Sequence, residues 1–326
     1  MPIPAPNLNP PFNIIRLSHL ELGVSDLAAA KRFYVDTLGL QITHEEDTRL
    51  YLRAMEERGH HSVILAQTGQ PAVAVLGFKV WDEAALDLAA AWFETRGLPV
   101  DWVTRAHMGR TLRTRDPWGV PLEFYASMDR LPPIHQNYQL YRGVKPLRID
   151  HFNLFSADVD AAVAFYGELG FRVTEYTEDE ATGRIWAAWM HRKGGVHDIA
   201  FTNGTGPRLH HAAFWVPTPL NIIDLLDLMS TTGYVSAIER GPGRHGISNA
   251  FFLYVRDADG HRTEIYCSDY QTVDPDLEPI KWDLKDPQRQ TLWGAPAPKS
   301  WFEEGSMFEG VDVSESALKA TPIVAP

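Results

Sequence analysis

Three residues of metal-binding types lie in separate stretches that predict β-strands. Each stretch is short and rich in β-branched and aromatic residues, with His151 in 147–154, His211 in 209–214 and Glu264 in 262–266. Two neutral imidazoles and one carboxylate on neighbouring strands form a facial triad, which binds Fe(II) or Mn(II) and leaves positions open for a substrate and O2. The three residues are far apart in the sequence, so their spacing alone is weak evidence for a shared site. An internal repeat provides stronger evidence.

Strand periodicity sets an expectation about which neighbours join this site. Side chains alternate along a strand, so Ile149, His151 and Asn153 should share one face. A lone buried histidine is more often a hydrogen-bonded core residue than a ligand. The stretches that contain His211 and Glu264 nevertheless favour a ligand role for His151. By the same alternation, His210 should point away from the face of His211 and should not be a ligand.

Four segments of the chain share one order of elements: a strand, an amphipathic helix, a glycine and then several strands. The helices are expected from Ser25 or Asp26 to Gly39, from Asp82 to Gly97, from Asp158 to Leu169 before Gly170, and from Asn221 to Met229 before Gly233. Aspartate is a favoured N-cap and glycine a favoured residue just after a helix. The repeat predicts an α+β fold of four βαβββ modules paired into two domains.

The expected domain organisation follows from the repeat. Residues 14–145 form an N-terminal two-module domain and residues 146–270 a C-terminal two-module domain. Residues 1–13 are an N-terminal arm, expected to be flexible. Residues 271–326 match no repeat, and their aromatic residues predict a lid over the second half, with disorder from about Val311.

Superposition of the halves shows which one should bind metal. His19 falls on His151 and Glu123 on Glu264, whereas Val75 falls on His211. His61 falls on His197. A site with one histidine and one glutamate is a poor metal site, so we expect the first half to lack a metal and the second half to be catalytic.

The composition limits the class of protein. Of the 326 residues, 44% are hydrophobic and 22% charged, which is ordinary for a globular protein, and the net charge of −12 argues against nucleic-acid and anionic-membrane partners. Cys267 is the one cysteine, so no intrachain disulfide can form. No apolar run is long enough to span a bilayer, and the N-terminus lacks the apolar region of a signal peptide. A cytoplasmic protein is expected.

The repeat, the three ligand candidates and three long runs (187–194, 206–211 and 238–246) resemble the vicinal oxygen chelate superfamily. Within it the chain is similar to the type I extradiol ring-cleaving dioxygenases, from about Ile14 to Trp301. The resemblance implies Fe(II) or Mn(II), O2 as co-substrate and a homotetramer. It implies His151, His211 and Glu264 as metal ligands; His197, Tyr254, His245 and Asn153 as catalytic residues; and Trp189, Arg240, Trp301 and Arg289 as substrate-binding residues.

The resemblance also implies the substrate: a catechol with a short acidic side chain, such as 3,4-dihydroxyphenylacetate, cleaved beside one hydroxyl to a muconic semialdehyde. One position departs from the family pattern, because Gln290 stands where an arginine helps to bind the substrate carboxylate. Catechol or an alkylcatechol is therefore the alternative substrate.

Two other classes of protein compete with the dioxygenase. A glyoxalase or thiol transferase of the same superfamily shares four ligands between the halves, and Val75 argues against that arrangement. A metal-free small-molecule-binding protein of the same fold is usually a single half and lacks the triad. Oxygen uptake with a catechol on iron-loaded protein separates the three classes.

Overall fold

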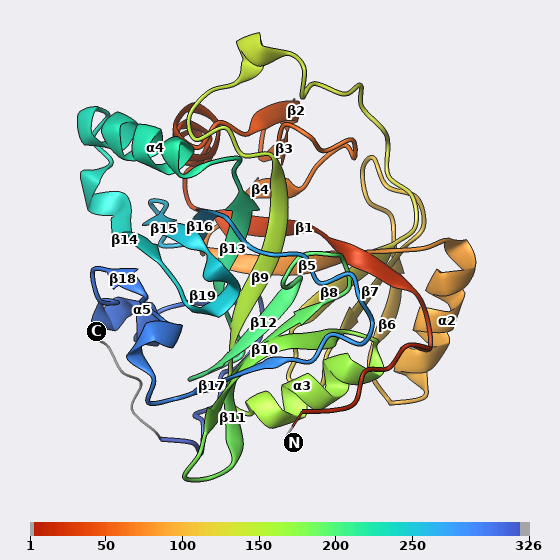
Figure 1. Ribbon diagram of the computed structural model, residues 1–326. Coiled ribbons are helices and arrows are strands. Elements are labelled where there is room, and N and C mark those ends of the chain that lie inside the picture. Colours follow the sequence, from red (N-terminus) through yellow and green to blue (C-terminus); the bar gives the residue numbers. More distant parts are fainter. Residues whose placement is uncertain (1–2, 320–326) are drawn as a thin grey trace.

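Two twisted β-sheets form the centre of the molecule in the computed structural model, which describes residues 3–319 (Figure 1). The strand order of the first sheet is β2-β3-β4-β1-β5-β8-β7-β6. The order of the second is β17-β10-β11-β12-β9-β13-β16-β15-β14-β18, with β19 paired to β13. This arrangement confirms the predicted α+β fold.

The elements of the first half run from residue 14 to residue 140. They are β1 (Ile14–Val24), α1 (Leu27–Lys31), the π-helical turn η1 (Arg32–Thr37), β2 (Gln41–Glu46), β3 (Arg49–Arg53), β4 (Val63–Gln67), β5 (Ala72–Val80), α2 (Glu83–Glu94), β6 (Val100–Val103), β7 (Thr111–Arg115), β8 (Pro121–Tyr125) and η2 (Tyr138–Leu140).

The elements of the second half repeat this order and are followed by a C-terminal segment. They are β9 (Arg148–Ser156), α3 (Val159–Glu168), β10 (Arg172–Asp179), β11 (Arg184–His191), β12 (Ile199–Asn203), β13 (Arg208–Trp215), α4 (Pro219–Thr231), η3 (Val235–Ala237), β14 (Ile238–Arg244), η4 (Ile247–Asn249), β15 (Phe251–Arg256) and β16 (Arg262–Cys267). The C-terminal segment adds β17 (Ile280–Asp283), η5 (Pro287–Arg289), β18 (Trp293–Gly294), α5 (Lys299–Glu303) and β19 (Ser306–Met307).

Each βαβββ module is closed in the same way. Its first and last strands pair in parallel, as β1 pairs with β4 and β9 with β12. Two modules join through an antiparallel pair of first strands, β1 with β5 and β9 with β13. The predicted fourfold repeat is therefore also a repeat of hydrogen-bonding topology.

Helix ends lie close to where the sequence predicts them. The side chains of Asp26, Asp82 and Asp158 accept hydrogen bonds from backbone amides in the first turns of α1, α2 and α3. Each such cap contributes about 1 kcal/mol. Gly170, just after α3, has a φ of +86°, a conformation that is costly for residues with a Cβ. Helix α4 starts earlier than expected, at Pro219 after the N-cap Thr218.

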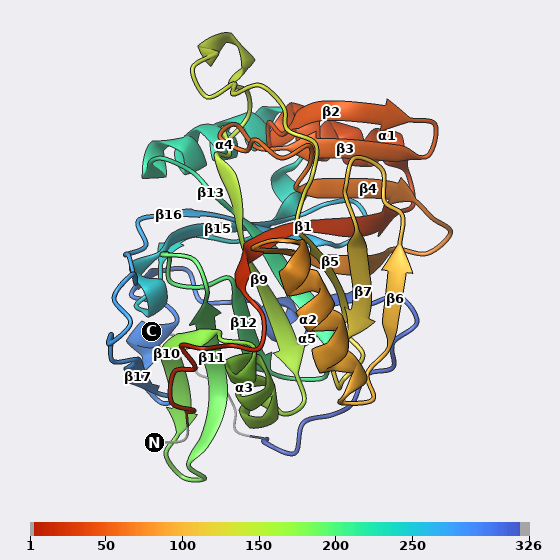
Figure 2. The same cartoon turned by 90° about the vertical axis from the view of Figure 1, so that its right-hand side faces the viewer.

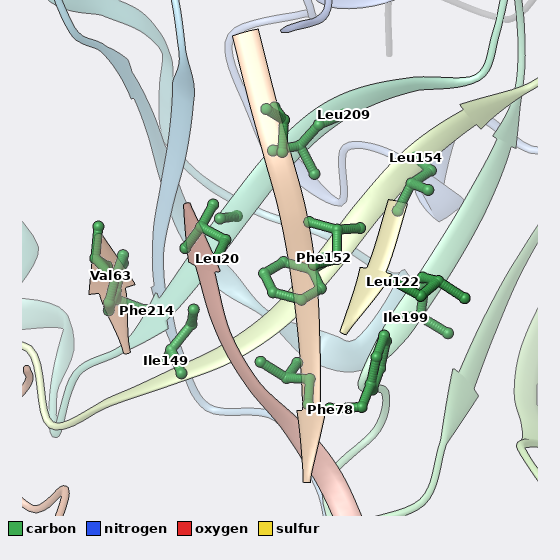
Figure 3. Packing of buried hydrophobic residues seen from close by; sticks show 14 of the residues in the cluster. Leu20, Val63, Phe78, Leu122, Ile149, Phe152, Leu154, Ile199, Leu209 and Phe214 are labelled. Atoms are coloured by element: carbon green, nitrogen blue, oxygen red, sulfur yellow. The ribbon is translucent and has the colours of Figure 1, made fainter. Parts of the chain in front are cut away.

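The main hydrophobic core lies between the two halves (Figure 3). Buried side chains from β1, β4, β5 and β8 meet those from β9, β12 and β13; for example, the ring of Phe78 packs edge-on against that of Phe152 at 6.3 Å. Replacing a buried phenylalanine of this kind by alanine typically costs ~3–5 kcal/mol. Helix α2 packs against strands of the first sheet and α3 against strands of the second, and both contribute buried side chains such as Phe93 and Tyr166 to the same core (Figures 1 and 2).

Both chain ends are more tightly packed than predicted. The arm does not hang free, because Phe12 is buried and the Asn7 side chain donates a hydrogen bond to the Glu168 carbonyl. The expected disorder from Val311 is wrong for residues 311–319, since the backbone of Ser314 pairs with that of Gly206. The rest of that expectation, residues 320–326, lies outside the described part of the chain. None of the helices in residues 3–319 has the length and hydropathy needed to cross a lipid bilayer.

One predicted face is also wrong. Ile149 packs into the core with Phe152 and Leu154, whereas His151 and Asn153 line a cavity on the other side of β9. The reason is a β-bulge: His151 pairs with Ala213 and Ile149 with Phe214, so one residue of β9 is skipped.

Candidate active site and metal centre

Three adjacent strands of the second sheet present the predicted triad on one face. Ala213 in the central strand β13 pairs with His151 on one side and with Glu264 on the other. His211 lies two residues before Ala213 and so points to the same face. The register of the sheet therefore brings the three ligand candidates together, and the small side chain of Ala213 leaves room between them.

The nitrogen and oxygen atoms of the three candidate ligands lie close enough together to share one metal ion. Nε2 of His151 lies 3.2 Å from Nε2 of His211, and each lies 3.0 Å from Oε2 of Glu264. Among residues 3–319, these three form the one group of His, Cys, Asp or Glu side chains close enough together to share an ion. Metal–ligand bonds of about 2.1 Å place neighbouring ligand atoms about 3.0–3.4 Å apart, so the observed distances fit one shared ion.

The charges of the three groups also call for a cation. Burial alone would raise the pKa of Glu264, but hydrogen bonds from His151 and His211 hold it well below its usual range, so it is ionised. Burial lowers the pKa of His211 to about 4. Burial also opposes a charge on His151, but Asp150 and Glu264 outweigh it and raise its pKa. The cluster needs one positive charge at its centre, and metal binding replaces a proton there.

His197 lies in the same cavity, beside His151. Its ring centroid is 3.8 Å from that of His151, and its buried Nδ1 has no hydrogen-bond partner in the described structure. Burial, and next the neighbouring His151, hold its pKa well below the usual range. His197 is therefore a neutral base with a nitrogen left for a bound molecule.

Tyr254 and His245 form a hydrogen-bonded chain that leads away from the triad. The backbone carbonyl of Gln290 accepts a hydrogen bond from Nδ1 of His245, which leaves Nε2 as the acceptor for the Tyr254 hydroxyl at 3.1 Å. The Gln290 contact is made by the backbone and is independent of its side chain. Asn153 also lines the cavity, and its Oδ1 accepts a hydrogen bond from Thr202 at 3.2 Å.

The cavity over the triad has a volume of about 430 Å³. Of the four predicted substrate-binding residues, Trp189, Trp301 and Arg289 line it. Arg240 does not. Its guanidinium lies behind the wall, 4.7 Å from the Trp301 ring centroid and 4.8 Å from that of Phe252.

Two buried guanidinium groups close to this cavity have unused donors. Nε and Nη1 of Arg240 and Nη2 of Arg289 have no hydrogen-bond partner in the described structure. Burial lowers the pKa of each side chain to about 10, so both remain charged at neutral pH. A buried cation without an anionic partner is costly, so this end of the cavity favours a carboxylate ligand.

Several site residues were missed from the sequence. Part of the C-terminal tail closes the cavity, with Glu315, Ser316, Leu318 and Lys319 among the lining residues. This part of the tail has no aromatic residues, so its sequence did not indicate that it lines a cavity. His210 was expected to point away, but its Nδ1 lies 2.6 Å from Nδ1 of His211. Burial, and next Arg262, hold the pKa of His210 well below its usual range, so it is neutral.

The first half has an incomplete counterpart of this site. Gly77 pairs with both His19 and Glu123, as Ala213 pairs with His151 and Glu264. Val75 takes the place of His211. The Glu123 carboxylate accepts hydrogen bonds from His19 and from Arg113, each at 2.9 Å, and Arg105 lies 3.3 Å away, so two arginines already neutralise it.

Comparison with known proteins gives consistent matches. The family model described as Glyoxalase/Bleomycin resistance protein/Dioxygenase superfamily matches residues 16–124 and 148–265. The structure of homoprotocatechuate 2,3-dioxygenase from Brevibacterium fuscum in complex with 3,4-dihydroxyphenylacetate is 42% identical, with a TM-score of 0.90; the match covers 96% of this chain and 99% of that one.

Two curated relatives are similar over most of their length. Metapyrocatechase from Geobacillus stearothermophilus is 30% identical over 315 residues, 91% of this chain and 95% of its own. Manganese-dependent 2,3-dihydroxybiphenyl 1,2-dioxygenase from Geobacillus genomosp. 3 is 29% identical over 302 residues, 88% of this chain and 95% of its own.

Proposed function

Because the chain belongs to the Glyoxalase/Bleomycin resistance protein/Dioxygenase superfamily and is an extradiol ring-cleaving dioxygenase that uses Fe(II) or Mn(II) and O2, we propose that its substrate is 3,4-dihydroxyphenylacetate. The product would be the corresponding muconic semialdehyde, which keeps both atoms of O2. We further propose that His151, His211 and Glu264 are the metal ligands. Their spacing and charge, described above, support this assignment.

The unused donors of the buried arginines carry the substrate proposal. The catechol end of a substrate belongs at the triad, and its side chain then extends toward Arg289 and Trp301. Among residues 3–319, Nη2 of Arg289 has no hydrogen-bond partner, and Arg240 contributes a second buried positive charge behind Trp301. A charge-assisted hydrogen bond to a carboxylate contributes ~1.5–3 kcal/mol, which corresponds to about tenfold to a hundredfold in affinity. A neutral catechol gains none of this.

The residues around the triad then divide the work. Held by His151, His211 and Glu264, an Fe(II) or Mn(II) ion would supply open coordination positions and a path for electrons between the ring and O2. His197 takes a proton from a catechol hydroxyl and returns it to the oxygen that is reduced. A neutral histidine suits this role because a ring nitrogen is free to accept the proton and to release it again within the reaction.

Tyr254, His245 and Asn153 act by orientation and hydrogen bonding. The Tyr254 hydroxyl donates to Nε2 of His245, so its oxygen lone pairs remain for a donor on the substrate. The His245 ring stacks on Phe252 with centroids 3.8 Å apart, which fixes the ring plane. The Asn153 amide nitrogen remains for an oxygen acceptor, because its Oδ1 is used by Thr202.

We propose a division of labour along the chain as well. The domain of residues 14–145 supports the fold without metal, residues 146–270 carry the chemistry, and the C-terminal segment from residue 271 covers the cavity.

Exposed apolar side chains such as Trp81, Tyr138 and Leu220 are consistent with the expected homotetramer. Light scattering after size-exclusion chromatography tests that state. A cytoplasmic location remains part of the proposal, and cell fractionation tests it.

Substrate competition tests the proposed function. The value of kcat/KM should be at least tenfold higher for 3,4-dihydroxyphenylacetate than for 4-methylcatechol on iron-loaded or manganese-loaded protein. Plain catechol should resemble 4-methylcatechol, because neither has an anion for the arginines. A tenfold preference for 4-methylcatechol would reject the acidic substrate and favour the alkylcatechol alternative, while extradiol cleavage itself would stand.

A further inference from the structure

Two residues are skipped in the pairing of β9 with β13, and each comes directly before a ligand histidine. Leu209 pairs with Leu154 and His211 with Asn153, so His210 has no partner across the strands. On the other strand, His151 and Ile149 pair with Ala213 and Phe214, so Asp150 is skipped. A bulge breaks the alternation of a strand and re-aims the extra side chain. It brings both side chains against the ring of the following histidine.

Asp150 contacts the first ligand. Its Oδ2 lies 3.1 Å from Nδ1 of His151, and it also accepts a hydrogen bond from the hydroxyl of Tyr266. Lys193 Nζ lies 2.8 Å from Oδ1 of the same carboxylate. A carboxylate only accepts, so Nδ1 of His151 carries a proton and donates it. Nε2 is then the nitrogen that faces the metal position with its lone pair.

His210 contacts the second ligand through a chain of two hydrogen bonds. Its Nε2 lies 2.8 Å from the backbone carbonyl of Trp301, which only accepts. Nε2 of His210 therefore carries the proton, and Nδ1 of this neutral ring is an acceptor. It receives the hydrogen bond from Nδ1 of His211 at 2.6 Å. The tautomer of His211 is thus fixed with a bare lone pair on Nε2.

We propose that Asp150 and His210 are positioning residues, placed by the two bulges so that each fixes the tautomer and ring orientation of the ligand histidine that follows it. This inference rests on the proposed roles of His151 and His211 as metal ligands. Helix α5, which lines the cavity through Trp301, would also orient His210, because the Trp301 carbonyl accepts its hydrogen bond. Partners of this kind commonly change metal affinity by about 10- to 100-fold.

The first half provides an internal comparison. The pairing of β1 with β5 skips Ser18, directly before His19, and Ala74, directly before Val75. Ser18 still hydrogen-bonds Tyr125, the counterpart of Tyr266, but Nδ1 of His19 has no partner in the described structure. Both bulges are therefore present where no complete triad exists, and only the side chains that would orient the ligands are absent.

Titration of the metal-depleted full-length protein with Mn(II), followed by the electron paramagnetic resonance signal of the free ion, tests the proposal without an activity assay. Asp150→Ser, which copies the first half, and His210→Leu should each raise the Kd for Mn(II) by about 10- to 100-fold. Asp150→Asn and His210→Gln keep an acceptor for the ligand N–H and should stay within about threefold of the wild type. Ser18→Ala is the matched control and should leave the Kd unchanged.

The outcomes separate this inference from the assignment of the triad. If His211→Ala abolishes Mn(II) binding while Asp150→Ser and His210→Leu bind like the wild type, the ligands stand and the positioning role is rejected. If His211→Ala binds Mn(II) normally, the triad itself is rejected. Equal losses in the Leu and Gln variants at His210 would also overturn the inference, because the acceptor atom would then be irrelevant. Should His210→Leu fail to fold, the Asp150 pair decides the matter.

Discussion

Nε2 of His19 lies 2.9 Å from Oε1 of Glu123, and the pair occupies in the first half the place of His151 and Glu264 in the second. In the first half, Val75 occupies the position of His211. A histidine at this position should not be enough to create a metal site, because Arg113 and Arg105 lie 2.9 Å and 3.3 Å from the Glu123 carboxylate and repel a cation.

The first prediction therefore concerns Val75→His. This variant should still bind one metal ion per chain, as should His19→Ala, because neither change touches the second half. Metal analysis by inductively coupled plasma mass spectrometry measures the ratio. Two ions per chain in Val75→His would show that the arginines do not close the first site.

The second prediction concerns proton transfer. His197→Phe should retain the metal and bind a catechol, but its reaction with O2 should slow by ~10²–10⁴-fold, the usual contribution of a general acid–base group. Anaerobic formation of the catechol complex followed by rapid mixing with O2 isolates this step. His61→Phe, at the equivalent place in the first half, is the control. An unchanged rate in His197→Phe would remove this histidine from the mechanism.

The third prediction concerns substrate charge. Arg289→Met should lower kcat/KM for 3,4-dihydroxyphenylacetate by about tenfold to a hundredfold, because it removes a charge-assisted hydrogen bond. Arg240→Ala should act in the same direction. The value for 4-methylcatechol should change little in both variants.

Arg208 supplies the control for this comparison. It also lines the cavity, but its Nε and Nη1 already donate to the carbonyls of Thr205 and Glu303 at 2.7 and 2.9 Å. Arg208→Met should therefore not discriminate between acidic and neutral catechols. Equal effects of Arg289→Met on both substrates would argue against a carboxylate at this end of the cavity.

The fourth prediction concerns stability and pH. Burial raises the pKa of Asp116 from 3.8 to about 7, and the Tyr166 hydroxyl of the other half donates to its carboxyl at 3.2 Å. Between these pH values the folded protein holds a proton that the unfolded chain has lost, so the stabilisation present at low pH is lost as the pH rises toward 7. The full difference is at most ~4 kcal/mol.

Asp116→Asn removes this titration. Relative to the wild type, the variant should gain free energy of unfolding as the pH rises from 5 to about 8. Chemical denaturation of both proteins in parallel, at matched metal loading, measures the difference. A difference that stays constant over this range would contradict the raised pKa.

The sequence predicted the features that depend on local chemistry or on the repeat. The Asp caps of α1, α2 and α3 and the glycines after the helices follow from local conformational preferences, and the repeat predicted the equivalence of the halves. The fold and the family are confirmed. The structure also brings together the three ligand candidates, with His197 and Tyr254 in the same cavity.

The features that depend on strand register were not predictable from alternation. The skipped residue in β9 placed Ile149 in the core and Asp150 against His151. The skipped residue in β13 brought His210 against His211. The position of Arg240 behind Trp301, and the docking of the tail, depend on contacts between distant segments for which no local pattern exists.

The central claim is that His151, His211 and Glu264 hold the ion that cleaves the catechol. Metal content and O2 uptake, measured together on Glu264→Ala, test it most directly. The account predicts that this variant purifies without bound iron or manganese and takes up no O2 with 3,4-dihydroxyphenylacetate, while its thermal unfolding still shows a folded protein. Wild-type metal content in Glu264→Ala would contradict the account.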